Sequence, residues 1–292
     1  YGSLVFVSAF LLFLVQPLLG KAILPWFGGS SAVWAACLVF FQGMLLGGYA
    51  YAHLIARYLA PAAQWVVHSV VLLASLLFLP LTTPDLEGGG AGADVLLTLA
   101  AVVGVPYLLL SSTSPLAQAW FARLEGEELP YRLFAISNFA SLAALICSPL
   151  AIEPWLSLPS QMNSWTAGYG LFAAILAAAA FLQRTAPRDT AHPDPEGIPV
   201  SWVDFVFWLA LPAAGSMLLV ASTTHLTQNI APVPFLWVMP LALYLFTYVM
   251  AFADGRWLHP ALLRTLGLVG CAGLIVFYIG HTSHCSAKIT IP

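Results

Sequence analysis

The chain has 292 residues and a formal net charge of -3, yet only 7% of its residues are charged while 61% are hydrophobic. A soluble domain carries about a quarter charged residues, so these few charges cannot cover a surface that faces water. The mean hydropathy of +0.90 therefore predicts an integral membrane protein whose main partner is the lipid bilayer. The slightly acidic balance excludes the basic footprint of a nucleic-acid-binding protein.

The apolar windows between charged residues predict a polytopic helical bundle. A membrane helix needs about 20 mainly apolar residues, and the runs are continuous rather than alternating, which favours helices over a barrel. The longest window, Phe205–Ala253, is long enough for two helices that "THLTQNIAPVP" (Thr224–Pro234) separates. We expect an all-α fold with nine spans near residues 3–23, 32–56, 63–83, 95–121, 132–152, 165–184, 201–222, 234–253 and 260–281.

A polar, proline-rich stretch, "QRTAPRDTAHPDPEGIP" (Gln183–Pro199), divides the chain. It predicts a six-helix bundle over residues 1–184, a cytoplasmic linker over 185–200 and a second segment of three helices over 201–292. The predicted helices near 32–56 and 234–253 resemble each other: each begins near a Trp after an outer loop and ends before an Arg and a Pro. An offset of six helices is the plan of major facilitator transporters, and on that plan the second half stops after three.

The basic residues orient the bundle, because Lys and Arg concentrate in cytoplasmic loops. With a cytoplasmic N-terminus, the outer side holds only Lys21 and Lys288. The cytoplasmic loops then hold the other basic residues, Arg57, Arg123, Arg132, Arg184, Arg188, Arg256 and Arg264. We therefore expect a multi-pass protein with its N-terminus in the cytoplasm.

Several stretches resemble one family. They are "LLFLVQPLLGKAILPWFGGSSAVW", "FFQGMLLGGYAYAHLIAR", "GVPYLLLSSTSPLAQAWFAR", "YRLFAISNFASLAALICSPLAIEPWL" and "THLTQNIAPVPFLWVMPLALYLFTYVMAFA". Together they are similar to the polytopic, major-facilitator-like membrane module of bacterial spermidine-synthase-like fusion proteins. The resemblance implies a location in the bacterial inner membrane.

Members of that family usually continue into a soluble aminopropyltransferase-like domain, which binds a decarboxylated S-adenosylmethionine-type donor through a Gly-rich strand–turn–helix. The sequence beyond the last predicted helix, "HTSHCSAKITIP", does not resemble that continuation. We therefore expect no aminopropyltransferase activity from this chain alone.

Polar residues inside the predicted spans are candidate sites by default, because unpaired polar groups are costly in lipid. Gln16 precedes Pro17, and either faces a ligand at a kink or caps a helix end. Gln42 and Asn138 lie deeper, and each either binds a substrate or joins two helices. Lys21 either binds an anion or extends its ammonium group to the lipid headgroups.

The densest polar patch is "LSSTSPLAQAW" (Leu110–Trp120), in which Ser114 and Gln118 are the candidate ligand-binding residues. Pro115 removes a backbone donor and predicts a kink. The neighbouring hydroxyls either satisfy helix carbonyls or line a midplane site, and the sequence leaves both interpretations open. The short outer motif "HTSHC" has the His and Cys ligands of a zinc or haem site, but such short isolated clusters usually bind nothing. We therefore expect no metal and no cofactor.

Three outer segments predict one compact cap, because each carries proline and an amide and has a Trp in or beside it. They are "VQPLLGKAILPWFGGSSAVW", "IEPWLSLPSQMNSW" and "THLTQNIAPVP", and they contribute the candidates Trp34, Glu153, Gln228 and Asn229. Gly28–Gly29 is expected to supply a tight turn. Glu153 is the only acid on these loops, so we expect it to pair with Lys21.

Three function classes remain open. The first is a transporter-like or ligand-binding membrane module for a small molecule, although the scarcity of acids weakens polyamine transport. The second is the membrane anchor of an aminopropyltransferase whose soluble catalytic domain is absent here, either by truncation or because it is a separate partner. The third is an accessory or structural subunit that binds other membrane subunits.

Overall fold

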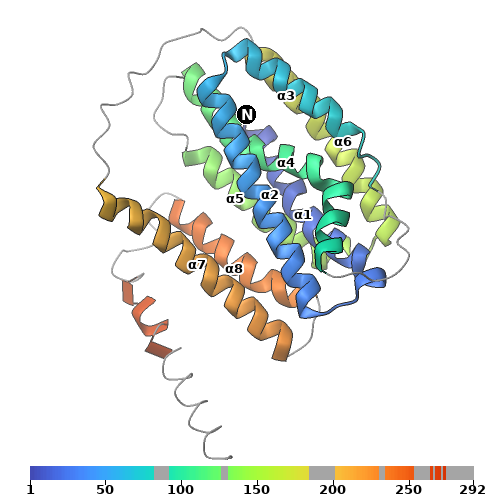
Figure 1. Ribbon diagram of the computed structural model, residues 1–292, viewed down its shortest axis with the longest axis vertical. Coiled ribbons are helices and arrows are strands. Elements are labelled where there is room, and N and C mark those ends of the chain that lie inside the picture. The colour runs from blue at the N-terminus through green and yellow to red at the C-terminus, as the bar shows by residue number, and fades with distance from the viewer. Residues whose placement is uncertain are drawn as a thin grey trace, which may run out of the picture. The chain divides into compact units, whose positions relative to one another are not determined.

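The computed structural model describes residues 1–81, 92–125, 131–183, 201–229 and 234–252, together with a few residues between 264 and 273. The chain forms two compact units, Tyr1–Tyr248 and Val249–Pro292, and the described helices of the first are labelled in Figure 1. They are α1 (Gly2–Phe27), α2 (Ser31–Tyr58), α3 (Pro61–Leu76), α4 (Gly92–Glu125), α5 (Tyr131–Cys147), the π-helical turn η1 (Ser148–Ile152), α6 (Leu158–Gln183), α7 (Trp202–Asn229) and α8 (Pro234–Phe252). Every element in these ranges is helical, which confirms the expected all-α class for the described residues.

Six of these helices are long and apolar enough to cross a membrane: α1, α2, α4, α5 continued by η1, α6 and α7. The apolar stretches of α3 and α8 are shorter. The described part of the chain is therefore that of an α-helical membrane protein. The span expected near 260–281 falls largely outside the described residues, as do the linker expected over 185–200 and the tail "HTSHC".

Three predicted helix boundaries were wrong. Helix α3 ends at Leu76 rather than near residue 83. Helix α6 begins at Leu158 rather than near residue 165, so the segment between η1 and α6 shrinks to five residues, 153–157. Pro159 is compatible with helix there because the first turn has no use for its missing N–H group. Helix α7 continues to Asn229, past the expected end near residue 222. The hydroxyls of Ser222 and Thr223 bond to carbonyls of their own helix, so these polar residues do not interrupt it.

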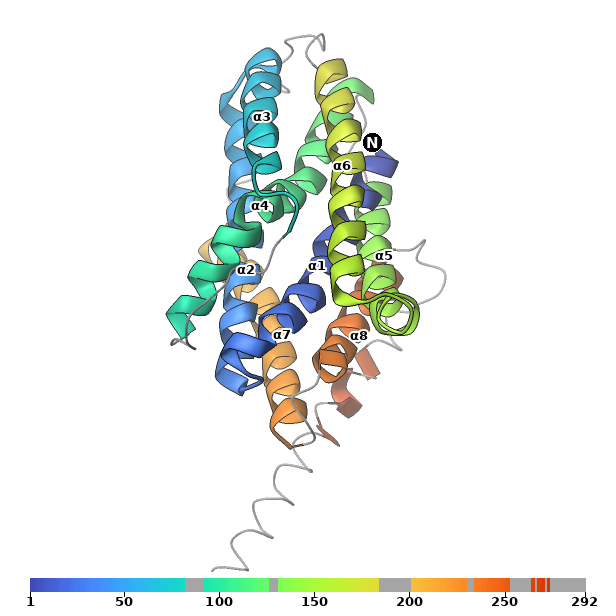
Figure 2. The ribbon, with the colours of Figure 1, turned by 90° about the vertical axis from the view of Figure 1, so that its right-hand side faces the viewer.

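The first six helices pack in a regular pattern (Figures 1 and 2). Helix α1 packs against α4, α5 and α6, helix α4 packs against α1, α2 and α3, and α3 packs against α6. Helices α1 and α4 are the most deeply buried spans, whereas the span in α7 has no buried residue in its apolar window. The main core therefore follows α1 and α4 at the centre of the bundle.

Helices α2 and α4 cross closely at Gly48. A Cβ atom added at Gly48 would lie 1.9 Å from Ser111 Oγ, so only glycine allows this approach. The Ser111 hydroxyl lies 2.9 Å from the carbonyl oxygen of Leu108 on its own helix and 3.3 Å from that of Met44 on α2. Small residues commonly permit such close approach of membrane helices.

A second, smaller core cluster involves α8. Trp34, Leu145, Val238 and Leu245 are buried together, which joins the start of α2 and the end of α5 to α8. At the turn before α2, Gly28 has a φ of 71°, a backbone conformation that favours glycine. The expected tight turn at Gly28–Gly29 is therefore confirmed.

Candidate functional site

The buried centre of the bundle holds a hydrogen bond between α1 and α4. Gln16 Nε2 donates to the hydroxyl oxygen of Tyr107 at 3.1 Å, and the two residues are 6% and 1% exposed. Gln16 precedes Pro17 on α1, and Tyr107 follows Pro106 on α4. Gln16 is therefore not a helix-end cap but a side chain that joins two proline-containing helices.

The ring of Tyr107 is enclosed by aromatic neighbours from α2. The ring centroids of Phe40 and Phe41 lie 6.4 and 5.2 Å from that of Tyr107. Such packing holds the ring in one place, so its hydroxyl is fixed toward α1. The hydrogen bond to Gln16 thus lies in a rigid, apolar surrounding shared by three helices.

An ion pair joins α1 to the segment before α6, as the sequence predicts. Lys21 Nζ lies 2.6 Å from Glu153 Oε1, and the side chains are 39% and 46% exposed. The π-helical turn positions the carboxylate, because the Glu153 N–H donates to the Ser148 carbonyl at 2.8 Å across the widened turn. The predicted Lys21–Glu153 pairing is confirmed, and it links residues 132 positions apart.

The hydroxyl patch on α4 resolves into two parts. Ser112 and Thr113 both donate to the Leu109 carbonyl, at 2.9 and 2.6 Å, so their hydroxyls serve the helix backbone. Ser114 instead accepts a hydrogen bond from Gln118 Nε2 at 3.2 Å, and both side chains are partly buried. Of these residues, only Ser114 and Gln118 bond to each other through their side chains rather than to the backbone. A ligand could therefore replace either partner in that hydrogen bond.

The remaining candidates are not brought together into one site. Trp34 is buried in the cluster beside α8, and Asn138 on α5 donates to the Phe134 carbonyl of its own helix at 2.9 Å. Gln42 is exposed near the middle of α2. The side chains of Gln228 and Asn229 lie outside the described residues, as does the segment that follows them.

The sequence interpretation missed a polar network between α2, α3 and α4. Trp120 Nε1 donates to Gln64 Oε1 at 2.9 Å, and Gln64 Nε2 donates to the Leu59 carbonyl at 2.8 Å. One turn along α3, the buried ring of His68 shares a hydrogen bond of 3.0 Å with the Tyr51 hydroxyl. The available signal was that buried Trp and Tyr require partners for their polar atoms, and Gln64 and His68 share one face of a helix.

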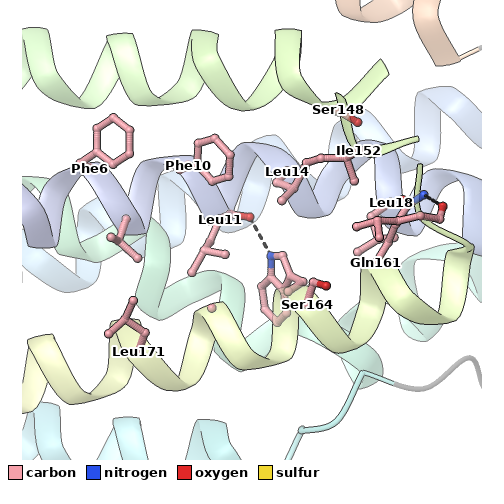
Figure 3. A pocket seen from close by; sticks show the side chains of 14 residues that line it. Phe6, Phe10, Leu11, Leu14, Leu18, Ser148, Ile152, Gln161, Ser164 and Leu171 are labelled. Atoms are coloured by element: carbon pink, nitrogen blue, oxygen red, sulfur yellow. Dashed lines mark hydrogen bonds between the residues drawn. The ribbon is translucent and has the colours of Figure 1, made fainter. Parts of the chain in front are cut away.

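A cleft of about 350 Å³ lies between α1, η1 and α6 (Figure 3). Phe6 and Phe10 lie toward one end, and Gln161 lies toward the end near Leu18. The floor is fixed by Trp165, whose indole N–H donates to the Leu11 carbonyl at 2.9 Å. The lining is almost wholly apolar, so the cleft favours an apolar occupant.

No protein-family profile, no curated protein and no solved structure matches the chain.

Proposed function

We propose that the chain is a major-facilitator-like membrane module that binds, and in the manner of a transporter moves, a small hydrogen-bonding molecule. The proposal includes the nine spans, the cytoplasmic N-terminus, the bacterial inner membrane and the relation to the spermidine-synthase-like membrane modules. It rests chiefly on how the first six helices pack against one another.

The packing is consistent with two related three-helix units. The two units correspond when α1 is paired with α4, α2 with α5, and α3 with α6. Under this exchange, the contact of α1 with α5 becomes the contact of α4 with α2, and both contacts are present. The contacts of α1 with α6 and with α2 become those of α4 with α3 and with α5. The pairs α1–α4 and α3–α6 map onto themselves. A unit with an odd number of spans is followed by one of opposite direction, as in the inverted repeats of transporters.

The repeat relation points to the crossing of α1 and α4 as the ligand site. Transporter sites lie at the interface between repeats, where helices are interrupted. Both helices carry internal prolines: Gln16 precedes Pro17, Tyr107 follows Pro106, Ser114 precedes Pro115 and Gln118 lies three positions beyond it. These groups offer amides and hydroxyls rather than charges, which favours a neutral, hydrogen-bonding ligand over a polyamine.

The test is ligand binding by the purified chain in lipid nanodiscs. A panel of neutral polar metabolites and polyamines is screened for protection against thermal unfolding, and hits are measured in proteoliposome uptake. We expect Gln118→Leu to abolish protection while Asn163→Leu, at an exposed position on α6, leaves it unchanged. Equal protection of both variants, or no protection of the wild type by any compound, contradicts the proposal.

A second candidate function, a subunit of a larger membrane assembly, is supported by Gln42. Its side chain is exposed near the middle of α2, between the exposed apolar residues Val39 and Leu46. An amide that faces hydrocarbon is costly unless it is paired, so a polar group on another helix would stabilise it. A photo-crosslinking residue at position 42 distinguishes the alternatives: crosslinks to one protein in native membranes favour the subunit, and crosslinks to lipid alone exclude it.

A further inference from the structure

The cleft between α1, η1 and α6 has polar groups at one end only. Ser148 on η1 and Ser164 on α6 both line it, and neither hydroxyl bonds to another described residue. Gln161 uses its amide nitrogen on the Leu156 carbonyl at 2.8 Å, and its Oε1 has no bond from the described residues. Two hydroxyls and a carbonyl oxygen therefore remain available to an occupant.

The polar end coincides with the Lys21–Glu153 ion pair. Lys21 follows the lining residue Leu18 by three positions on α1, and Glu153 directly follows the lining residue Ile152. Charged side chains of membrane helices lie near the headgroups. The cleft thus begins at headgroup level and continues into the hydrocarbon region toward Phe6.

The dimensions of the cleft exclude a helix. The lining residues Phe6 and Leu18 are twelve positions apart on α1, about 18 Å at the helical rise. A helix of that length, about 10–12 Å across with its side chains, fills roughly 1,400–2,000 Å³. The cleft volume of about 350 Å³ is far smaller, whereas a single hydrocarbon chain fits.

We propose that this cleft is a binding site for one acyl chain of a glycerophospholipid from the leaflet at the Lys21 end of α1. The acyl chain lies along α1 between the aromatic rings of Phe6 and Phe10 and the side chain of Leu171. The ester and glycerol oxygens of the lipid accept from the hydroxyls of Ser148 and Ser164. This site lies on the flank of the bundle and is independent of the ligand site proposed at the α1–α4 crossing.

The test uses the full chain in vesicles of phosphatidylethanolamine and phosphatidylglycerol, with a fraction of the phosphatidylethanolamine carrying a diazirine near the end of one acyl chain. After illumination, the lipid adducts are mapped by peptide mass spectrometry. We expect adducts to concentrate on Phe6, Phe10 and Leu171 rather than on lipid-exposed residues of α7 such as Leu209, which is 65% exposed.

A filled cleft provides the decisive comparison. Ser164→Phe places a ring among the lining residues, whereas Asn163→Phe adds the same ring at an exposed neighbouring position that does not line the cleft. We expect the first variant to lose cleft adducts severalfold and the second to retain them. Ser164 is itself exposed, so both variants are expected to fold, and Ser164→Leu serves as the substitute if one does not.

Two results overturn the proposal. One is labelling that follows exposure alone, equal on α7 and in the cleft and unchanged by Ser164→Phe. The other is a cleft without lipid adducts in which Ser164→Phe changes the oligomeric state, since a second copy of the chain would then be the occupant. Neither result bears on binding at the α1–α4 crossing, so this proposal and the proposed function fail separately.

Discussion

Replacing Gly48 by alanine tests the close crossing of α2 and α4. The new Cβ atom would lie 1.9 Å from Ser111 Oγ, 2.9 Å from Ser111 Cβ and 3.0 Å from the Leu108 carbonyl oxygen. The Ser111 hydroxyl can rotate away, but its Cβ and the Leu108 backbone belong to α4 itself. Helices α2 and α4 must therefore separate slightly before the alanine fits.

The expected magnitude follows from two opposing terms. Overpacking of a close-packed interior costs about 1–3 kcal/mol, while alanine gains about 0.5–1 kcal/mol over glycine inside a helix. The second term is shared by Gly43→Ala on the same helix, where nothing lies within 4 Å of the added Cβ. The difference between the two variants isolates the overpacking term, and we expect Gly48→Ala to be less stable than Gly43→Ala by about 1–3 kcal/mol.

The assay is equilibrium unfolding of the purified chain in mixed micelles, followed by far-UV circular dichroism and tryptophan fluorescence. In a background of Ser111→Gly, which removes the opposing Cβ and hydroxyl, the penalty of Gly48→Ala should become much smaller. Equal stabilities of Gly48→Ala and Gly43→Ala, or a penalty that Ser111→Gly leaves unchanged, would refute the close crossing of α2 and α4.

Three further predictions concern other contacts and the orientation. Reversing the charge of either Lys21 or Glu153 should lower the free energy of unfolding. Exchanging the two charges together should restore about 0.5 kcal/mol at low salt, as expected for a half-exposed pair. A double variant no more stable than either single variant contradicts the pairing. Tyr107→Phe should destabilise the chain by about 1 kcal/mol, because the buried amide on α1 loses its acceptor, and an unfolding curve identical to that of the wild type would show that this bond is not formed. In a background without native cysteines, a cysteine at Ser160 should react with an impermeant thiol reagent from outside intact cells and one at Ala62 only after permeabilisation, and the reverse pattern would invert the proposed topology.

Local sequence patterns were sufficient to predict the lipid environment, the all-α class of fold and one tertiary contact. Apolar windows of membrane-spanning length arise only where lipid surrounds the chain, so most helices could be located within a few residues. The Lys21–Glu153 pair was predictable because charges are scarce: among the three segments expected to form the outer cap, Glu153 was the only acid available to Lys21. Gly28 was predictable because a tight turn between two membrane helices needs a residue that tolerates positive φ.

Only the tertiary structure decided which faces of the helices meet. A helix that is apolar on all sides gives no periodic signal for its buried face, so the sequence could not assign Tyr107 as the partner of Gln16 or bring Tyr51 to His68. It likewise left open whether the α4 hydroxyls serve a ligand, and the structure assigns Ser112 and Thr113 to the backbone. The Gln16–Tyr107 and Tyr51–His68 contacts join side chains 91 and 17 positions apart, and in hydrocarbon the contacts between helices are set by packing shape and paired polar groups rather than by hydropathy.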